Sequence, residues 1–235
     1  FRGYASGLML IADMNNVAVG YRAGYAETTG TSNVLMGAGA GDAVTTGTNN
    51  TFIGHDAGGL NTTASNNVAL GYAALNQNST GTNNVAIGTN AVDACTTGNH
   101  LVGIGYQALS AVTTGQFSIG IGKDAGLSIT DGDANTLIGY HCGDAITTGD
   151  YNTMVGANAG SATTTVPNVN AFGYNALTAN STGQSLCAFG SYALDANTTA
   201  NDNAAFGHVA LSANTTGTGN NAFGSSSLDA NTTGS

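Results

Sequence analysis

The stretch Asn84-Val85-Ala86-Ile87-Gly88 decides the fold, because altered copies of it recur along the whole chain. Its last residue is one of fourteen glycines, here called the anchor glycines, that follow one another at equal intervals of seventeen residues. The anchor glycines are Gly3, Gly20, Gly37, Gly54, Gly71, Gly88, Gly105, Gly122, Gly139, Gly156, Gly173, Gly190, Gly207 and Gly224. A strict period without insertions predicts a repeat array, in which each repeat packs on its neighbours, rather than one packed globule.

The residues around each anchor glycine predict short strands and tight turns. Seventeen residues are too few for a helical-hairpin repeat, which needs over about thirty. β-branched residues precede the glycine and turn-forming residues follow it. We therefore expect an all-β fold, a parallel β-solenoid (a β-roll or β-helix) of about fourteen 17-residue coils. It is expected to be a single domain over residues 1–235, with an atypical first coil or junction at residues 1–19, and to be a segment of a longer chain.

Two columns of equivalent positions are expected to form the core. From Val19 onward, the position before the anchor glycine is apolar in every repeat, as in Ile53 and Ile87, and becomes Phe late in the chain. The position two residues earlier, as in Val85, shares its face and becomes more polar late in the chain. Further small-residue columns follow the glycine: Ala three residues later, and four residues later Gly alternating with Leu or Val in blocks of three, as in Gly58 and Leu75.

Thr-Thr-Gly, as in Thr96-Thr97-Gly98, marks the far turn of each repeat, where Gly is expected to supply a positive φ. Asn pairs such as Asn83-Asn84 follow it. Their side chains are expected to hydrogen-bond to one another along the stack of coils.

The composition excludes several classes of function. The net charge is −10, and the only cations are Arg2, Arg22 and Lys123. Such a chain cannot track a phosphate backbone, so we expect no nucleic-acid partner and no anionic membrane surface. No stretch is long and apolar enough to span a bilayer, so membrane insertion is not expected. Low charge can signal disorder, but 41% of the residues are hydrophobic and fall on a fixed period.

Few residues suggest catalysis or metal binding. Asp131 and Asp133 lie near Asp150 of the next repeat, and such carboxylates could cleave polysaccharide or bind calcium. However, Asp131-Gly132-Asp133 replaces a Thr-Thr-Gly turn, where Asp is an ordinary turn residue. The histidines have no ligand-spaced pairs; they are His55, His100, His141 and His208. We therefore assign no catalytic, cofactor-binding or metal-binding residue, expect no cofactor, and expect that the protein is not an enzyme.

The cysteines Cys95, Cys142 and Cys187 occupy different columns, two to three turns apart. That separation is ~10–14 Å along the axis at ~4.8 Å per coil, and disulfide Cα atoms lie within roughly 7 Å, so free thiols are expected. One column after the anchor glycine is often aromatic; its members are Tyr4, Tyr21, His55, Tyr72, Tyr106, Tyr140, Tyr174 and His208. It is expected to be exposed, and could form an intermittent stripe that stacks on sugars.

The pattern Asn-x-Val-Ala-Ile-Gly followed by x-x-Ala resembles the head repeat of trimeric autotransporter adhesins. The longer repeat here, with Asn50-Thr51-Phe52-Ile53-Gly54, is more similar to repeats of bacteriophage tail-fibre and related virion proteins. The resemblance covers Gly3 to the end of the sequence. It implies a left-handed β-roll in which three chains lie side by side, that is, a homotrimer.

The resemblance also implies a structural and adhesive role. The chain would be a rigid spacer of a tail fibre or bacterial adhesin, extracellular on a virion or bacterial cell surface, with a cell-surface glycan or protein as receptor. Two alternatives stay open. One is a tailspike-like enzyme that degrades polysaccharide with Asp131 and Asp133. The other is an ice-binding solenoid that uses its Thr residues, although alternate rather than adjacent Thr residues share a face.

Overall fold

The structure, a computed structural model, describes residues 15–235. All regular secondary structure in this range is β-strand, and the chain divides into unit 1, which ends at Phe117, and unit 2, Ser118–Ser235. The strands of unit 1 are β1 (Val17–Val19), β2 (Val34–Met36), β3 (Thr51–Ile53), β4 (Val68–Leu70), β5 (Val85–Ile87) and β6 (Val102–Ile104). Those of unit 2 are β7 (Ile119–Ile121), β8 (Thr136–Ile138), β9 (Thr153–Val155), β10 (Val169–Phe172), β11 (Leu186–Phe189), β12 (Ala204–Phe206) and β13 (Asn221–Phe223).

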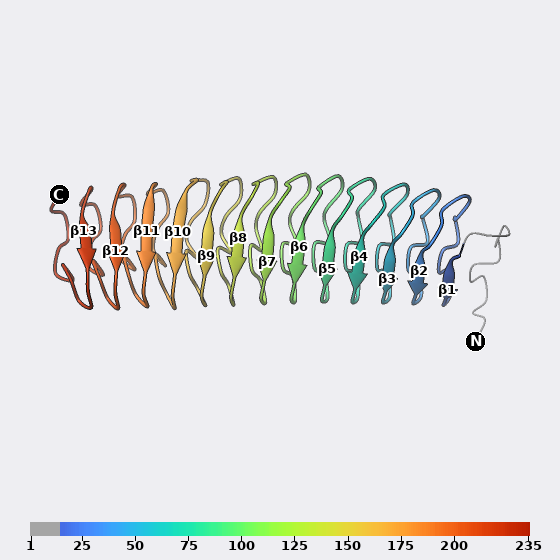
Figure 1. Cartoon of the computed structure of the whole chain (residues 1–235), viewed down its shortest axis with the longest axis horizontal. Coiled ribbons are helices and arrows are strands. Elements are labelled where there is room, and N and C mark those ends of the chain that lie inside the picture. Colours follow the sequence, from blue (N-terminus) through green and yellow to red (C-terminus); the bar gives the residue numbers. More distant parts are fainter. Residues whose placement is uncertain (1–14) are drawn as a thin grey trace. The chain divides into compact units, whose positions relative to one another are not determined.

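Within each unit every strand pairs in parallel with the next one along the chain (Figure 1). The register is seventeen residues throughout, as in Val68↔Val85 and Thr136↔Thr153. The predicted all-β parallel β-solenoid with one coil per repeat is therefore confirmed. The total of fourteen coils and the single continuous domain stay predictions. The expected atypical first coil, residues 1–19, lies mostly outside the described residues, whose first strand is β1.

The expected assignment of the core is wrong, because the middle residue of each strand points inward and its two neighbours point outward. Leu35, Phe52 and Ala86 are fully buried, whereas Val85 and Ile87 on either side of Ala86 are only half-buried. Alternate residues of a strand face opposite sides, so the apolar columns that were expected to fill the core cover the outside of the sheet. A 17-residue coil is too narrow to enclose two branched side chains from each strand.

A buried column of asparagines joins successive coils on the inner side. The backbone N–H of Asn84 donates to the side-chain oxygen of Asn67 at 2.9 Å, and the Asn84 amide donates to the Gly98 carbonyl at 2.8 Å. The backbone N–H of Leu101 in turn donates to Asn84 Oδ1 at 2.9 Å. The expected side chain–side chain bonding occurs on the exposed neighbours, where Asn49 donates to Asn66 at 3.2 Å. The buried asparagines bond instead to backbone groups of the next coil, each bond contributing about 1 kcal/mol.

The interior is filled in two alternative ways. In β2 and β3 the strand supplies the large side chain and the following turn supplies Gly, so that a Cβ at Gly58 would lie 2.5 Å from the Phe52 ring. In β4 and β5 the strand supplies Ala, and Leu75 or Val92 of the turn is fully buried instead. The alternating blocks of Gly and Leu therefore show where the large interior side chain comes from: the strand in some coils and the following turn in the others. Alanine three residues after the anchor glycine is buried within the coil in both units.

The two glycines that recur along the coils are required for different reasons. At Gly71, φ is +136°, and a Cβ would lie 2.6 Å from the Gly88 carbonyl oxygen of the next coil. The glycines of the Thr-Thr-Gly turns, and Gly81 of the equivalent Ser79-Thr80-Gly81 turn, are not among the residues with positive φ, so the expected reason for them is wrong. A Cβ at Gly81 would also meet the backbone of the next coil, at the Gly98 carbonyl. Close approach of coils alone explains the glycine of the Thr-Thr-Gly turn.

Candidate functional site

The outer face of the sheet, defined as the first and last side chains of each three-residue strand and their equivalents, is a large apolar surface. In unit 1 it consists of Val17, Val19, Val34, Met36, Thr51, Ile53, Val68, Leu70, Val85, Ile87, Val102 and Ile104. All but Thr51 are apolar. Val17 is 47% exposed and Leu70 44% exposed. These side chains, exposed or half-buried and apolar except at Thr51, have no covering element in the part of the chain described.

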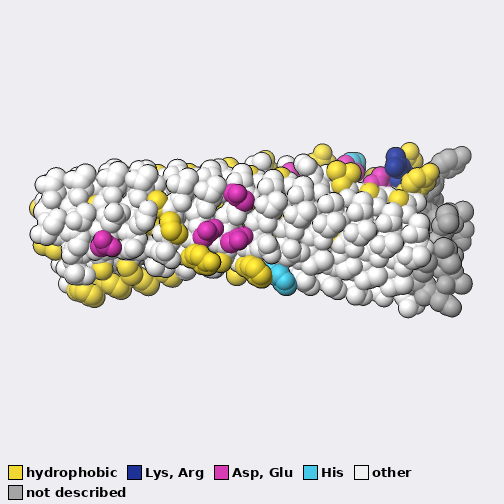
Figure 2. All heavy atoms as spheres, turned by 90° about the horizontal axis from the view of Figure 1, so that it is seen from above, with side chains coloured by type: hydrophobic (Ala, Val, Ile, Leu, Met, Phe, Trp, Pro, Cys, Tyr) yellow, Lys and Arg dark blue, Asp and Glu magenta, His cyan; other side chains and the backbone are white. Residues whose placement is uncertain are grey.

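The outer face of unit 2 has a different composition. One rank becomes polar or small, with Asn170, Cys187, Ala204 and Asn221. The other rank becomes a phenylalanine stack: Phe172, Phe189, Phe206 and Phe223, with ring centroids 4.2, 5.2 and 4.8 Å apart. Figure 2 shows hydrophobic side chains gathered in a band along one edge of unit 2, with few charged groups around it.

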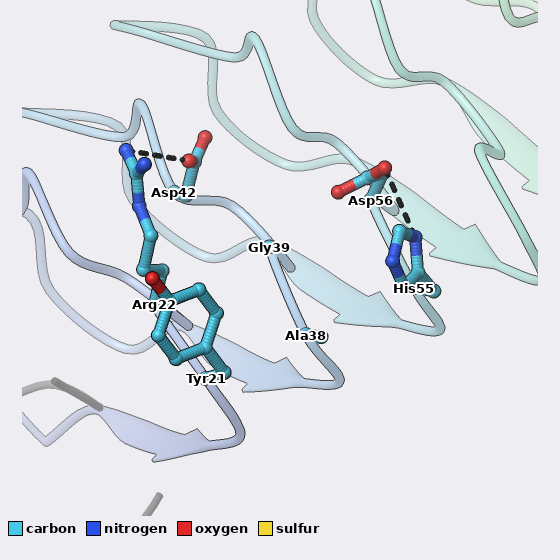
Figure 3. Close-up of a pocket in the computed structure, with 7 residues that line it drawn as sticks. All are labelled: Tyr21, Arg22, Ala38, Gly39, Asp42, His55 and Asp56. Carbon is cyan, nitrogen blue, oxygen red and sulfur yellow. Dashed lines mark ion pairs between the residues drawn. The ribbon is translucent and has the colours of Figure 1, made fainter. Parts of the chain in front are cut away.

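A small cavity of about 210 Å³ opens on unit 1 next to the anchor glycines. It is lined by Tyr21, Arg22, Ala38, Gly39, Asp42, His55 and Asp56 (Figure 3). Arg22 forms an ion pair with Asp42 at 3.1 Å, and His55 Nδ1 lies 2.9 Å from Asp56. Burial raises the pKa of the Asp42 carboxyl; the charge of Arg22 lowers it and that of Asp56 raises it further. The sequence pattern did not predict this convergence.

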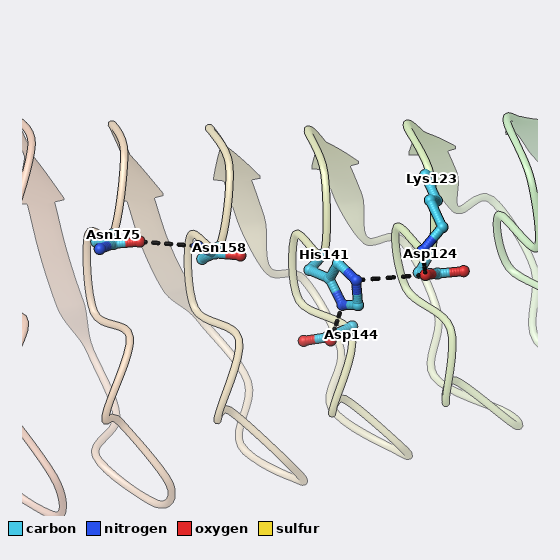
Figure 4. A network of polar contacts seen from close by, with 6 residues as sticks. All are labelled: Lys123, Asp124, His141, Asp144, Asn158 and Asn175. Carbon is cyan, nitrogen blue, oxygen red and sulfur yellow. Dashed lines mark hydrogen bonds and ion pairs between the residues drawn. The ribbon is translucent and has the colours of Figure 1, made fainter.

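A second polar cluster lies on unit 2 around His141 (Figure 4). Its ring bridges two carboxylates, with Nδ1 2.7 Å from Asp144 and Nε2 3.3 Å from Asp124. Lys123 also pairs with Asp124, at 2.7 Å. The second oxygen of Asp124 is buried and has no hydrogen-bond partner. Within residues 15–235 no group of three or more His, Cys, Asp or Glu side chains is arranged to hold a metal ion.

The acidic residues weighed for catalysis are brought together, but as part of the turn structure. The backbone N–H of Asp133 donates to Asp150 Oδ1 at 2.7 Å, and the Thr130 hydroxyl donates to Asp131 at 2.9 Å. The same coil-to-coil contact is made by uncharged side chains elsewhere, for example from the Thr82 N–H to Asn99. The geometry thus gives these carboxylates a turn-stabilising role.

The cysteines are free thiols in the structure, and they lie in different environments. Cys95 and Cys142 are buried in the interior, whereas Cys187 lies on the outer face of β11. Burial raises the pKa of Cys95 to about 11 and that of Cys142 to about 12.

The aromatic column after the anchor glycine is exposed, as expected; Tyr21 is 58% and Tyr72 55% exposed. The regular spacing of the aromatic residues in this column was not predicted from the sequence. Aromatic residues recur at intervals of thirty-four residues, as in Tyr72 and Tyr106 of unit 1 and Tyr140 and Tyr174 of unit 2. A search at twice the repeat length would have found this signal. The other histidines add rings to the surface: His55 stacks on Tyr72 at 5.5 Å, and His100 on Phe117 at 5.1 Å.

Comparison of the chain with protein-family models, with curated proteins and with solved structures gives no match. The described residues also contain no helix long and apolar enough to cross a membrane. The outer face and the cavity at Ala38 and Gly39 are therefore the two surfaces from which a function can be argued.

Proposed function

We propose that the chain is a structural and adhesive fibre segment that associates with further copies of itself through the outer face of its sheet. The observation that carries this proposal is the largely apolar outer face of unit 1, where eleven of twelve side chains are apolar and Thr51 is the exception. Large contiguous apolar patches on protein surfaces are typical of interaction sites. A covered outer face explains why β-branched residues are kept there, although the interior does not use them.

The properties of the outer face favour a second copy as its occupant. Its side chains repeat at the coil spacing of ~4.8 Å, and a surface with that repeat is matched by another copy of the same surface. Two side chains per coil along the strands provide an apolar area on the order of the ~800 Å² per partner that a stable interface buries. The outer face carries no charged residue in either unit, so no desolvation of ions opposes association.

The proposed number of copies is three, with the outer faces turned toward a common axis. The number rests on the resemblance to trimeric fibre and adhesin repeats, and a closed cyclic arrangement leaves no apolar surface to propagate association. The assembly would be extracellular, on a virion or bacterial cell surface, and would hold a terminal module away from its base. The polar turns on the other sides of each coil would face solvent and a cell-surface receptor.

Sedimentation equilibrium over a wide concentration range tests the assembly. The expected mass is about three times the chain mass of 23.1 kDa. The double variant Leu70→Asp/Ile87→Asp places charges on the outer face and is expected to give the monomer with an unchanged circular dichroism spectrum, because buried unpaired charges oppose association. The control Thr80→Asp/Thr97→Asp changes exposed turn residues by the same charge, and is expected to keep the wild-type mass. A wild-type monomer at all concentrations contradicts the proposal, and a mass of two chains contradicts the number.

The two alternative functions have less support. Polysaccharide cleavage would have to use Asp131 and Asp133, and Asp133 and Asp150 are joined in a coil-to-coil hydrogen bond that neutral residues make elsewhere. Ice binding would have to use the threonine turns, where the first hydroxyl of each pair donates to the next coil, as from Thr45 to Thr62 at 3.1 Å. An activity lost in Asp131→Ala/Asp133→Ala, or thermal hysteresis of the wild type, would establish one of them instead.

A further inference from the structure

The cavity on unit 1 is a gap in the aromatic column that follows the anchor glycines. Tyr21, Ala38, His55 and Tyr72 occupy this column in successive coils. Backbone bonds keep the coils in register, with the N–H of Gly39 donating to the Tyr21 carbonyl at 2.8 Å and that of Asp56 donating to Ala38 at 2.9 Å. His55 and Tyr72 in adjacent coils stack on one another. Ala38 therefore leaves one ring out of the column, between Tyr21 and His55 (Figure 3).

The width of the gap matches one inserted ring. Tyr21 and His55 are two coils apart, which is ~9.6 Å at ~4.8 Å per coil. Rings in contact have centroids about 4.5–7 Å apart, so the spacing of the two coils leaves room for one ring between them. Both side chains are 58% exposed and so can receive a ligand from solvent. A cavity of about 210 Å³ is smaller than the roughly 300–1,000 Å³ of typical drug-sized sites, which favours a single small ring.

The floor of the gap is polar, and the absence of a side chain at Gly39 makes room for it. Because Gly39 has no side chain, Asp56 folds back over it, and a Cβ at position 39 would collide with Asp56 Oδ1. Asp42 lies beside it and is paired with Arg22, whose guanidinium carbon is 5.0 Å from the centre of the Tyr25 ring. The floor thus offers two carboxylates as acceptors and one guanidinium as donor.

We propose that this gap, formed by Tyr21, Ala38, Gly39 and His55 over Asp42 and Asp56, is a binding site for one neutral hexopyranose unit of a glycan. The C–H face of the sugar stacks on the exposed rings. Its hydroxyls donate to Asp42 and Asp56 and accept from Arg22. The excess of carboxylates over cations disfavours an anionic ligand. This site rests on the adhesive part of the proposed function and adds the chemical class of its receptor, a glycan with neutral sugar units.

Other positions of the column also lack a ring between two aromatic coils, among them Thr89, Ala157 and Ser191, but each of these is followed by a residue other than glycine. Ala157 follows Tyr140 and precedes Tyr174 in the same column, but the next residue is Asn158 rather than Gly. The Asn158 amide donates to Asn175 at 3.0 Å (Figure 4), so the polar floor is filled by a satisfied pair. The site is therefore assigned to unit 1 alone.

Saturation-transfer difference NMR on the full chain tests the site, with glucose, galactose, mannose and N-acetylglucosamine as neutral probes, glucosamine as the cation and glucuronate as the anion. At least one neutral sugar is expected to bind with a dissociation constant on the order of 1 mM. Ala38→Tyr fills the gap with a ring native to this column, and Gly39→Asn displaces Asp56 with a residue that other coils carry at the equivalent Asn90 and Asn158. Each is expected to weaken binding by more than about tenfold. The matched control Thr89→Tyr, in the same column, is expected to bind as the wild type.

The outcomes separate this inference from the proposed assembly, because the mass of each variant is measured on the same samples. Sugar binding lost in Ala38→Tyr and Gly39→Asn with an unchanged mass and circular dichroism spectrum supports the site. Binding of no neutral hexose, binding of glucosamine alone, or equal binding by Ala38→Tyr and the wild type overturns it. A monomeric wild type that still binds the sugar overturns the assembly and leaves the site standing.

Discussion

Unit 1 and unit 2 have the same kind of interior, and they differ in the side chains on the outer face of the sheet. In both units alanine follows the anchor glycine three residues later, and asparagines join successive coils, as at Asn84 in unit 1 and Asn135 in unit 2. On the outer face, unit 1 presents two ranks of mostly aliphatic residues. In unit 2 the first three strands keep aliphatic residues in one rank, and β10–β13 present a phenylalanine stack beside polar or small residues.

The difference shows which positions the coil itself constrains. Interior positions must satisfy backbone groups of the neighbouring coil and fill a space of fixed size, so their residues recur. Outer positions have no such requirement within the chain, and they have diverged while staying apolar in at least one rank. The remaining constraint on the residues at these outer positions is what they contact outside the chain. Variants that break the interior should act alike in both units, and variants on the outer face should have little effect on folding.

The largest effect is expected at the anchor glycines, which both units share. Gly71→Ala in unit 1 and Gly190→Ala in unit 2 each force a side chain into a φ of +136° or +140° and against the backbone of the next coil. Backbone strain and the clash with the next coil add, so we expect each to lower the free energy of unfolding by about 5 kcal/mol or more, measured by urea denaturation.

The control for the anchor glycines is Gly81→Ala, where a Cβ meets the same kind of backbone contact without a positive φ. Ala64 and Ala200 occupy that column in other coils and are buried there, so the coils can separate slightly. We expect a loss of about 1 kcal/mol or less, the size of a small local adjustment. Equal losses at Gly71 and Gly81 would show that contact rather than φ decides both positions.

The next effect concerns the exchange of volume between strand and turn. Phe52→Ala removes a fully buried ring from β3, and is expected to lower the free energy of unfolding by about 3–5 kcal/mol. The double variant Phe52→Ala/Gly58→Leu gives this coil the arrangement of Ala69 and Leu75 in the next one. It is expected to regain most of the loss, less about 1 kcal/mol for a leucine at positive φ.

Phe206→Ala on the outer face of unit 2 is the matched comparison, because the same ring is removed from a half-buried position. Its stack with Phe189 and Phe223 is lost, which corresponds to about 1 kcal/mol. Urea denaturation of dilute, dissociated chains gives both values. A loss at Phe206 as large as that at Phe52 would contradict the inner and outer assignment.

The sequence predicted the parallel coil because a period without insertions leaves every coil equivalent. It did not predict the inner face, since both faces of each strand carry apolar residues and the branched ones at Val85 and Ile87 are the more hydrophobic. Asn84 shares a face with Ala86, and a polar residue there suggests solvent. Its burial depends on the Gly98 carbonyl of the next coil, a contact that periodicity does not show. The cavity was missed for a similar reason, since Asp42 and Asp56 come from different columns of successive coils.

The smallest effect is expected from the thiols, which distinguish inside from outside. The thiolate is the reactive form. Burial raises the pKa of Cys95 to about 11 and that of Cys142 to about 12, whereas Cys187 lies on the outer face. A disulfide reagent near pH 8 should therefore modify Cys187 alone in folded, dissociated chains and all three cysteines after unfolding. Native reaction of Cys142 would contradict its interior position.

The same burial links stability to alkaline pH. The folded chain keeps the Cys142 proton to about 12, whereas an unfolded thiol loses it near 9.0. Between these values the folded state binds more protons, so the free energy of unfolding falls as the pH rises. The stabilisation is fully present below 9.0 and is lost toward 12. Cys142→Ala supplies the residue that its column carries in other coils, and should reduce this dependence between pH 9 and pH 10.5. Tyrosines also ionise near 10, but both chains carry the same tyrosines, so the difference between the two slopes reports the thiol. Burial raises the pKa of Cys187 as well, so Cys187→Ala should also reduce the slope, but less than Cys142→Ala does, because this thiol lies half-buried on the outer face.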